Sequence, residues 1–112
     1  MSIYSLTLSQ RTQEGDVVTI DLHNLKKAAL ILRALNHKLR QQIIKLIDET
    51  EKITVTEIYT SLRIEQSVAS QHLAILRKAG IVTTTRNGKF IFYALNTNRI
   101  DEITEFVQHL LK

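Results

Sequence analysis

The sequence predicts a mainly helical domain with one small β-hairpin. From Leu22 onward, apolar residues recur at the three- and four-residue spacing of helices. A predicted helix from about Gln66 to Ala79 ends at Gly80, and two segments rich in β-branched and aromatic residues follow it directly. This order of elements, a helix-turn-helix followed by a hairpin, is that of a winged helix-turn-helix.

The composition limits the class of protein. At 112 residues the chain fits one domain with a modest core, and its apolar fraction of 44% is typical of folded chains. It has no apolar run approaching the ~18 residues of a transmembrane helix. Residues 1–5 lack the features of a secretory signal, and without cysteine there is no disulfide or thiolate metal site. We therefore expect a cytoplasmic protein with no membrane partner.

Residues 1–21 are expected to form an N-terminal extension, and residues 22–112 the winged helix-turn-helix domain. Segments 4–8 and 18–22 alternate apolar and polar residues, as strands do. The alternation is compatible with a hairpin, with pairing to a partner subunit, or with a loose segment.

The first helix has more apolar surface than one side of a small domain usually buries, and the last helix has a clean apolar stripe. The first starts at Leu22 and the last near Asn98. Their apolar positions are Leu22, Leu25, Ala29, Leu30, Ile31, Leu32 and Leu35, then Ile100, Ile103, Phe106, Val107, Leu110 and Leu111. Such stripes must pack on the chain's own core or on a second copy, so they favour a homodimer.

Two helices between them have predicted N-caps. One runs from about His37 to Asp48, with Asn36 as its cap. The next runs from about Val55 to Leu62, where Thr54 is the cap and Glu57 completes a capping box.

The turn at Arg63–Gln66 leads into the fourth helix. Its inward residues are Val68, Ala69, Leu73 and Leu76. The hairpin that follows is predicted to consist of strands Ile81–Arg86 and Lys89–Leu95, joined by Asn87-Gly88, a strong hairpin signal.

Basic residues are concentrated around the helix-turn-helix and the hairpin. Between Arg63 and Arg99 there are six basic residues and one acidic residue, Glu65, in a chain with a net charge of +4. This distribution is typical of a nucleic-acid-binding surface, although a solvated charged face would have the same composition.

The chain resembles the arsenic-repressor-like (ArsR-type) winged-helix transcriptional regulators. The segment from Leu32 to Ile44 is similar to the family's "LKALAHPTRLRIL" helix. Val68–Leu73 with Leu76–Val82 match the fairly specific pattern "S-x-H-L-x-x-L-x-x-A-G-[IL]-V". The wing Arg86–Lys89, with Tyr93–Leu95 after it, completes a match over about residues 25–111. The resemblance implies a homodimer joined by its first and last helices, an operator in double-stranded DNA, and repression that an inducer usually relieves.

The residues expected to contact DNA lie on the fourth helix, on the wing and at the start of the second helix. Hydroxyl and amide groups can bond base edges or phosphates, and basic groups bind phosphates. The predicted set is Ser67, Ser70, Gln71, His72, Arg77, Arg86, Lys89 and Arg40. For each, an ordinary polar surface is the alternative. For His72 a further alternative to reading a base is to hold a backbone group or a phosphate, and for Arg77 it is to interact with the helix dipole.

The metal-sensing members that this family includes use cysteine pairs or an Asp/His set on the last helix. This chain has no cysteine, and Thr97-Asn98-Arg99 stand where that set begins. We therefore predict no metal and no cofactor, with His23 and His109 as surface or interface histidines and His37 in a capping role.

No catalytic motif is present, so we predict that the chain is not an enzyme. Two alternatives remain: a winged helix that only binds proteins, and a metal-responsive repressor with a non-standard site. The polar, acid-free face of the fourth helix beside a basic wing favours DNA. No inducer or operator sequence is indicated.

Overall fold

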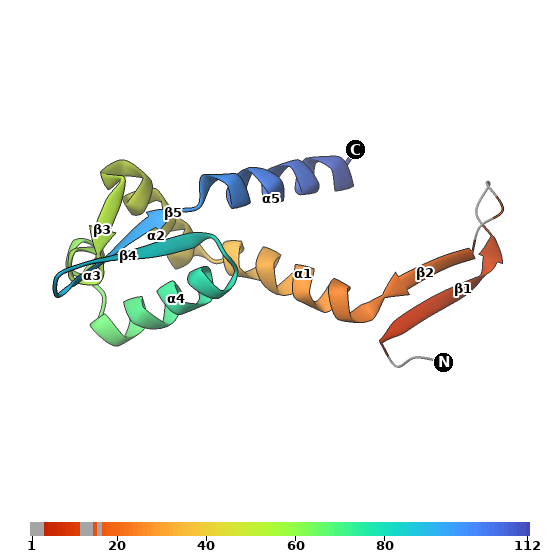
Figure 1. Cartoon of the computed structure of the whole chain (residues 1–112), viewed down its shortest axis with the longest axis horizontal. Coiled ribbons are helices and arrows are strands. Elements are labelled where there is room, and N and C mark those ends of the chain that lie inside the picture. The colour runs from red at the N-terminus through yellow and green to blue at the C-terminus, as the bar shows by residue number, and fades with distance from the viewer. Residues whose placement is uncertain (1–3, 12–14, 16) are drawn as a thin grey trace. The chain divides into compact units, whose positions relative to one another are not determined.

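The structure is a computed structural model that describes residues 4–11, 15 and 17–112. The chain divides into two compact units, Met1–Leu32 and Arg33–Lys112. Figure 1 shows the order of their elements.

The first unit contains an antiparallel hairpin of β1 (Ser5–Arg11) and β2 (Val17–Asp21). Leu6 pairs with Ile20 on one face, and Thr7 pairs with Thr19 on the other, where their hydroxyls lie 3.3 Å apart. Of the three predicted arrangements, the structure has the hairpin. The boundary between residues 21 and 22 stays a prediction.

Helix α1 (Leu22–Leu35) begins at the predicted residue. The Asp21 carboxylate accepts a hydrogen bond from the backbone N–H of Asn24 at 3.0 Å, as a helix N-cap does. Much of its apolar surface lies exposed, with Leu25 at 56% and Leu30 at 51%.

Helix α2 (Lys38–Thr50) begins at a different cap from the predicted one. His37 has the extended backbone of an N-cap, and its Nδ1 accepts from the backbone N–H of Leu39 at 3.2 Å. The prediction of Asn36 was wrong by one residue, because an imidazole nitrogen here does what a short polar side chain usually does. The predicted capping role of His37 is confirmed.

Strand β3 (Lys52–Thr54) leads into α3 (Val55–Leu62), which has the predicted bounds. The predicted capping box is confirmed. The Thr54 hydroxyl accepts from the backbone N–H of Glu57, and the Glu57 carboxylate accepts from the backbone N–H of Thr54, each at 3.3 Å.

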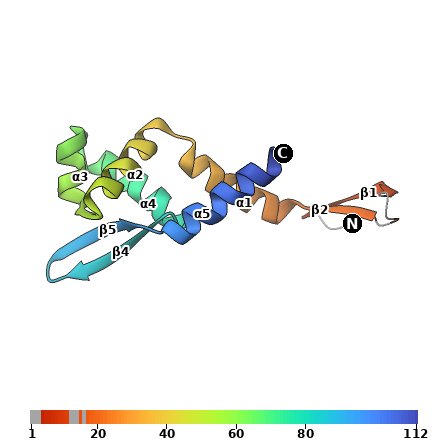
Figure 2. The same cartoon turned by 90° about the horizontal axis from the view of Figure 1, so that it is seen from above.

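Helix α4 (Gln66–Lys78) precedes the wing, which consists of β4 (Val82–Asn87) and β5 (Phe90–Leu95). Gly80 has the left-handed φ of +77° expected where the chain leaves the helix. The three-stranded sheet has the order β3-β5-β4, with antiparallel neighbours. Figure 2 shows the β4–β5 hairpin beside α2, α3 and α4.

The wing turn lies one residue later than predicted. Asn87 pairs with Phe90, so the two loop residues are Gly88 and Lys89 rather than Asn87 and Gly88. Gly88 has a φ of +64°, and Lys89 does not have a positive φ. This pattern is that of a type II′ turn, in which glycine takes the first loop position.

Helix α5 (Thr97–Leu110) begins one residue before the predicted start, because the Asn96 side chain caps it by accepting from the backbone N–H of Arg99. Its apolar stripe is only partly covered. Ile103 is buried, whereas Phe106, Leu110 and Leu111 are exposed.

The core of the second unit lies between α2, α3, α4 and the sheet. Its buried apolar residues are Ala34, Ile43, Ile47, Ile53, Ile58, Ala69, Leu73, Leu76, Ile81, Val82 and Ile103. The predicted fold class, mainly α with a small β-hairpin wing, is confirmed.

Candidate nucleic-acid interface

The turn between α3 and α4 sets the direction in which α4 leaves the core. Arg63 ends α3 with a left-handed φ of +55°, and its backbone N–H bonds the carbonyl of Thr60. The backbone N–H of Ile64 bonds the carbonyl of Tyr59. These bonds satisfy carbonyls at the end of α3 and place α4 immediately after it, as in a helix-turn-helix.

Helix α4 has one apolar face and one polar face. Ala69, Leu73 and Leu76 are completely buried. Ser67, Ser70 and Gln71 are exposed, at positions three and four residues apart. Because this spacing places side chains on one side of a helix, the three predicted contact residues share an accessible face in the first half of α4.

The wing presents the two predicted basic residues. Arg86 and Lys89 are both exposed. The Nε of Arg86 donates to the carbonyl of Gly88 at 3.1 Å, and the Nζ of Lys89 lies 5.4 Å from the centre of the Phe90 ring. These contacts hold the two cations close to the turn, where a phosphate can approach them.

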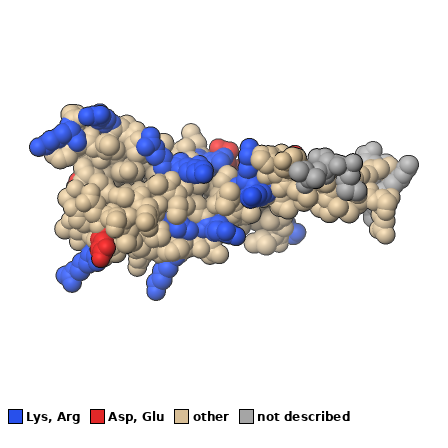
Figure 3. Space-filling model, turned by 90° about the horizontal axis from the view of Figure 1, so that it is seen from below, with Lys and Arg blue, Asp and Glu red and all other residues tan. Residues whose placement is uncertain are grey.

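Arg77 and Lys78 lie exposed in the last turn of α4. Their position beside the helix C-terminus is favourable for positive charge, whatever else they bind. From the side on which α4 lies, Lys and Arg atoms stand out at several places and Asp and Glu atoms are few (Figure 3).

Arg40 lies in a different place from the predicted one. It is only 7% exposed, and its guanidinium bonds the chain itself. Nε donates to the carbonyl of Ala34 at 2.7 Å, and another nitrogen donates to the carbonyl of Arg33 at 3.1 Å. The sequence placed Arg40 on the surface because long cations are rarely buried. In the structure, carbonyl groups at the C-terminal end of α1 accept hydrogen bonds from its guanidinium.

His72 is half-buried and faces α2 instead of the exposed face of α4. Its Nδ1 lies 3.1 Å from a terminal nitrogen of Arg40, and its ring centre lies 4.8 Å from that of His37. Burial, followed by the nearby His37 and Arg40, lowers the pKa of His72 below its usual value of 6.5. Among the two roles considered for His72, this position favours holding other protein groups.

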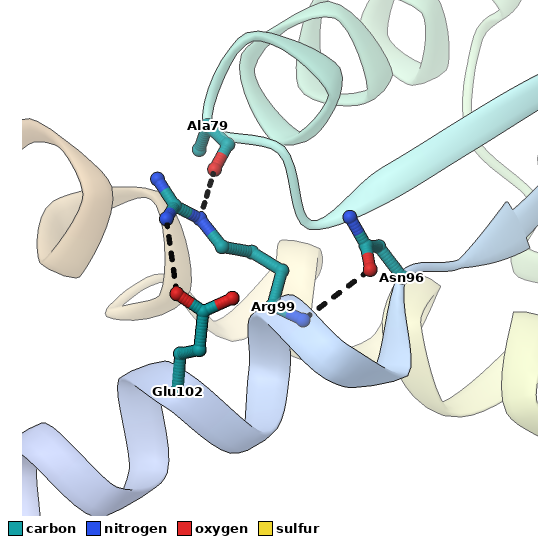
Figure 4. A network of polar contacts seen from close by, with 4 residues as sticks. All are labelled: Ala79, Asn96, Arg99 and Glu102. Carbon is teal, nitrogen blue, oxygen red and sulfur yellow. Dashed lines mark hydrogen bonds and ion pairs between the residues drawn. The ribbon is translucent and has the colours of Figure 1, made fainter.

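Arg99 joins the end of α4 to the start of α5 (Figure 4). Its Nε donates to the carbonyl of Ala79 at 3.3 Å, and a terminal nitrogen lies 3.8 Å from the Glu102 carboxylate. From the sequence, Arg99 was expected only to contribute positive charge to this region. The i, i+3 spacing to Glu102 was available as a signal, but the contact with Ala79 depends on the fold.

The other histidines show no metal cluster. His23 and His109 are exposed, and the ring of His23 makes an edge contact with Tyr4 at 6.0 Å between centres. In the part of the chain that the structure describes, no three His, Cys, Asp or Glu side chains meet in a group able to hold a metal.

No helix among residues 4–11, 15 and 17–112 is long and apolar enough to cross a membrane.

Comparison with known proteins gives the same assignment over most of the chain. Residues 37–84 match the model of "Bacterial regulatory protein, arsR family". The "Transcriptional activator HlyU" of Vibrio cholerae is 33% identical over 87 residues, which cover 78% of this chain and 80% of that protein. The "Transcriptional repressor PagR" of Bacillus anthracis is 27% identical over 88 residues, covering 79% of this chain and 88% of PagR.

The solved structures agree. The crystal structure of PagR superposes with a TM-score of 0.61 at 27% identity, covering 76% of this chain and 97% of that one. The α3–α4 helix-turn-helix and the β4–β5 wing therefore occur here in the setting of a known family. The chain belongs to the arsR family of bacterial regulatory proteins and is a winged helix-turn-helix transcriptional regulator rather than an enzyme.

Proposed function

We propose that the chain is a homodimeric repressor that binds a specific operator in double-stranded DNA. The observation that supports this most directly is the exposed, acid-free polar face of α4, with Ser67, Ser70 and Gln71, which occurs together with the basic wing at Arg86 and Lys89. A polar helix face can contact base edges in the major groove, and basic groups bind the flanking phosphates.

The proposed contacts fall into two chemical groups. Gln71 can donate to and accept from one adenine, and Ser67 and Ser70 can bond bases or phosphates. Arg86 and Lys89 supply affinity through phosphates or the minor groove, with Arg77 as a further phosphate contact. Arg40 and His72 are left out of this contact set.

The dimer is supported by uncovered apolar residues on two helices. Leu25 and Leu30 on α1, and Phe106 and Leu110 on α5, are each about half exposed or more. A two-fold dimer would place its two α4 helices in half-sites about 10 bp, or a multiple of this, apart.

Repression follows if the operator overlaps the site that polymerase needs. Relatives occur with both signs of regulation, since HlyU is named an activator and PagR a repressor. We propose that the chain acts in the cytoplasm. We also propose that it acts without a metal, because it has no cysteine and lacks the Asp/His set on its last helix.

The test is binding to a duplex of the chain's own upstream DNA and to a scrambled duplex, across a salt series. We expect preference for the upstream duplex and a steep loss of affinity as salt rises. Transcription from the same promoter, with and without the protein, gives the sign of regulation.

Binding to neither duplex at low salt would contradict the proposal and favour a protein-binding module. Equal binding to both would contradict sequence specificity for that region. Release of the bound duplex by zinc or arsenite would contradict metal-independent control.

A further inference from the structure

Within the second unit, Arg40 connects α2 with α4 and with the last turn of α1. Its guanidinium donates to the last carbonyls of α1, at Arg33 and Ala34, and reaches His72 on α4 from the first turn of α2.

The positive charge of Arg40 is balanced by the end of a helix. The carbonyls of Arg33 and Ala34 lie in the last turn of α1, at the end where the helix has a partial negative charge. The Arg33 carbonyl also accepts from the backbone N–H of Asn36. Within the described residues, every buried side-chain nitrogen and oxygen has a hydrogen-bond partner. The buried polar atoms of the Arg40 guanidinium are therefore satisfied by the groups around it.

The chemistry of the contact assigns the protonation state of His72. A guanidinium has only donors, so a hydrogen bond at 3.1 Å requires a lone pair on the Nδ1 of His72. The imidazole must then be neutral, with its proton on Nε2. The groups that face His72 are Arg40 and His37, both from the start of α2, and the Nδ1 of His37 is itself an acceptor, from Leu39.

We propose that His72 is a positioning residue for DNA binding and that it acts only as the neutral imidazole. In that state it accepts a hydrogen bond from Arg40, which holds the first half of α4 against the start of α2 and the end of α1. Because this bond restricts the rotation of α4 about its axis, the neighbouring residues Ser70 and Gln71 are held pointing outward. This inference rests on the proposed function, because it concerns how α4 is held for DNA.

Protonation of His72 removes this acceptor and places a second cation beside the guanidinium. The lowered pKa of His72, due first to burial, is consistent with a site that excludes the charged form. DNA affinity should therefore fall as the pH drops below the His72 pKa. A histidine that touched phosphate would behave oppositely, because protonation would add an attraction.

The experiment compares the full-length protein with His72→Asn and His72→Leu. Asparagine places an amide oxygen near the position of Nδ1 and does not titrate, whereas leucine removes the acceptor. Binding to the upstream duplex is measured at several pH values and across a salt series. Gln41→Ala is the matched control, because the Gln41 amide donates to the carbonyl of Leu35 at 2.9 Å and has no described contact with α4.

We expect His72→Asn to bind like the parent at neutral pH and to lose the part of the acid response that His72 causes. His72→Leu should bind about 5- to 30-fold more weakly at neutral pH, with an unchanged salt slope. Gln41→Ala should keep the affinity and the pH profile of the parent. NMR of the folded protein without DNA should show His72 with its proton on Nε2.

The inference would be overturned by stronger parent binding at acid pH that His72→Asn abolishes, by a salt slope lowered by about 0.9 in His72→Leu, or by a proton on Nδ1 at neutral pH. The first two would make His72 a phosphate contact. If the parent binds neither duplex, the proposed function fails and the DNA role of His72 fails with it. If the parent binds and His72→Leu does too with equal affinity, only the inference fails.

Discussion

Among the residues that the structure describes, Arg40 is the one polar or charged residue that is buried. Arg40 is buried without a described carboxylate partner, and it bonds two helix-terminal carbonyls and an imidazole. The three acceptors lie where the planar guanidinium can reach them together, and a lysine ammonium cannot reproduce that geometry.

Arg40→Lys is therefore expected to lower the free energy of unfolding by about 1–3 kcal/mol, because the buried carbonyl of Ala34 loses its donor. Urea denaturation of the two proteins measures the change. Gln41→Ala, which removes an exposed bond to the same end of α1, should cost less than about 1 kcal/mol. If both variants lost the same free energy of unfolding, the buried bonds of Arg40 would contribute no more to stability than the exposed bond of Gln41.

The stability of the protein should also depend on His72. Its pKa is lowered in the folded state, so the unfolded chain binds more protons in the window between that lowered pKa and 6.5. The free energy of unfolding should thus be insensitive to His72 above pH 6.5 and should fall as the pH drops through this window. Denaturation of the parent and of His72→Asn at matched pH values isolates the effect. A loss of the same size in both proteins would assign the acid response to other groups.

At the scale of elements, short side chains and glycines set the helix ends. The Thr54 and Glu57 capping box starts α3, the first helix of the helix-turn-helix. Thr54→Ala should lower the free energy of unfolding by about 0.5–2 kcal/mol, since a helix N–H loses its acceptor. Thr56→Ala is the control, because Thr56 lies exposed inside α3. Thermal or urea denaturation that fails to separate the two variants would contradict the role of the cap.

Gly80 and Gly88 both have left-handed backbones, but they differ in surroundings. A Cβ at Gly80 would lie 3.4 Å from the Nε of Arg99, whereas one at Gly88 would meet nothing within 4 Å. Alanine in this conformation costs about 1–2 kcal/mol. Gly80→Ala should cost more than Gly88→Ala, because it also disturbs the contact between Arg99 and Ala79. Measured by urea denaturation, a larger loss in Gly88→Ala would contradict this assignment.

At the scale of the whole molecule, the apolar surface of α5 makes a specific prediction about assembly. Phe106 is 49% exposed on the same stripe as the buried Ile103. Phe106→Glu should convert the proposed dimer to monomers and weaken operator binding, because a charge would be buried in the interface. Gln108→Glu adds the same charge on the opposite side of α5 and should leave the dimer intact. Sedimentation measures the oligomeric state of both variants. If Phe106→Glu is still a dimer, α5 is not part of the interface.

The elements of this protein were accessible from its sequence because they depend on local physical chemistry. Apolar periodicity predicted the start of α1 and both bounds of α3, and the spacing of Thr54 and Glu57 predicted the capping box. Gly80 marked the end of α4 because its left-handed conformation is local. The exposed face of α4 followed from the same periodicity.

Tertiary structure alone decided the roles of Arg40, His72 and Arg99. Each bonds a group at least six residues away, and Arg40 and His72 are 32 residues apart. No local rule predicts which cation will meet the carbonyl end of a helix, because that depends on how helices pack. The sequence by itself therefore determined the elements and the polar face of α4. Packing determined that two residues expected to touch DNA, Arg40 and His72, are hydrogen-bonded to each other.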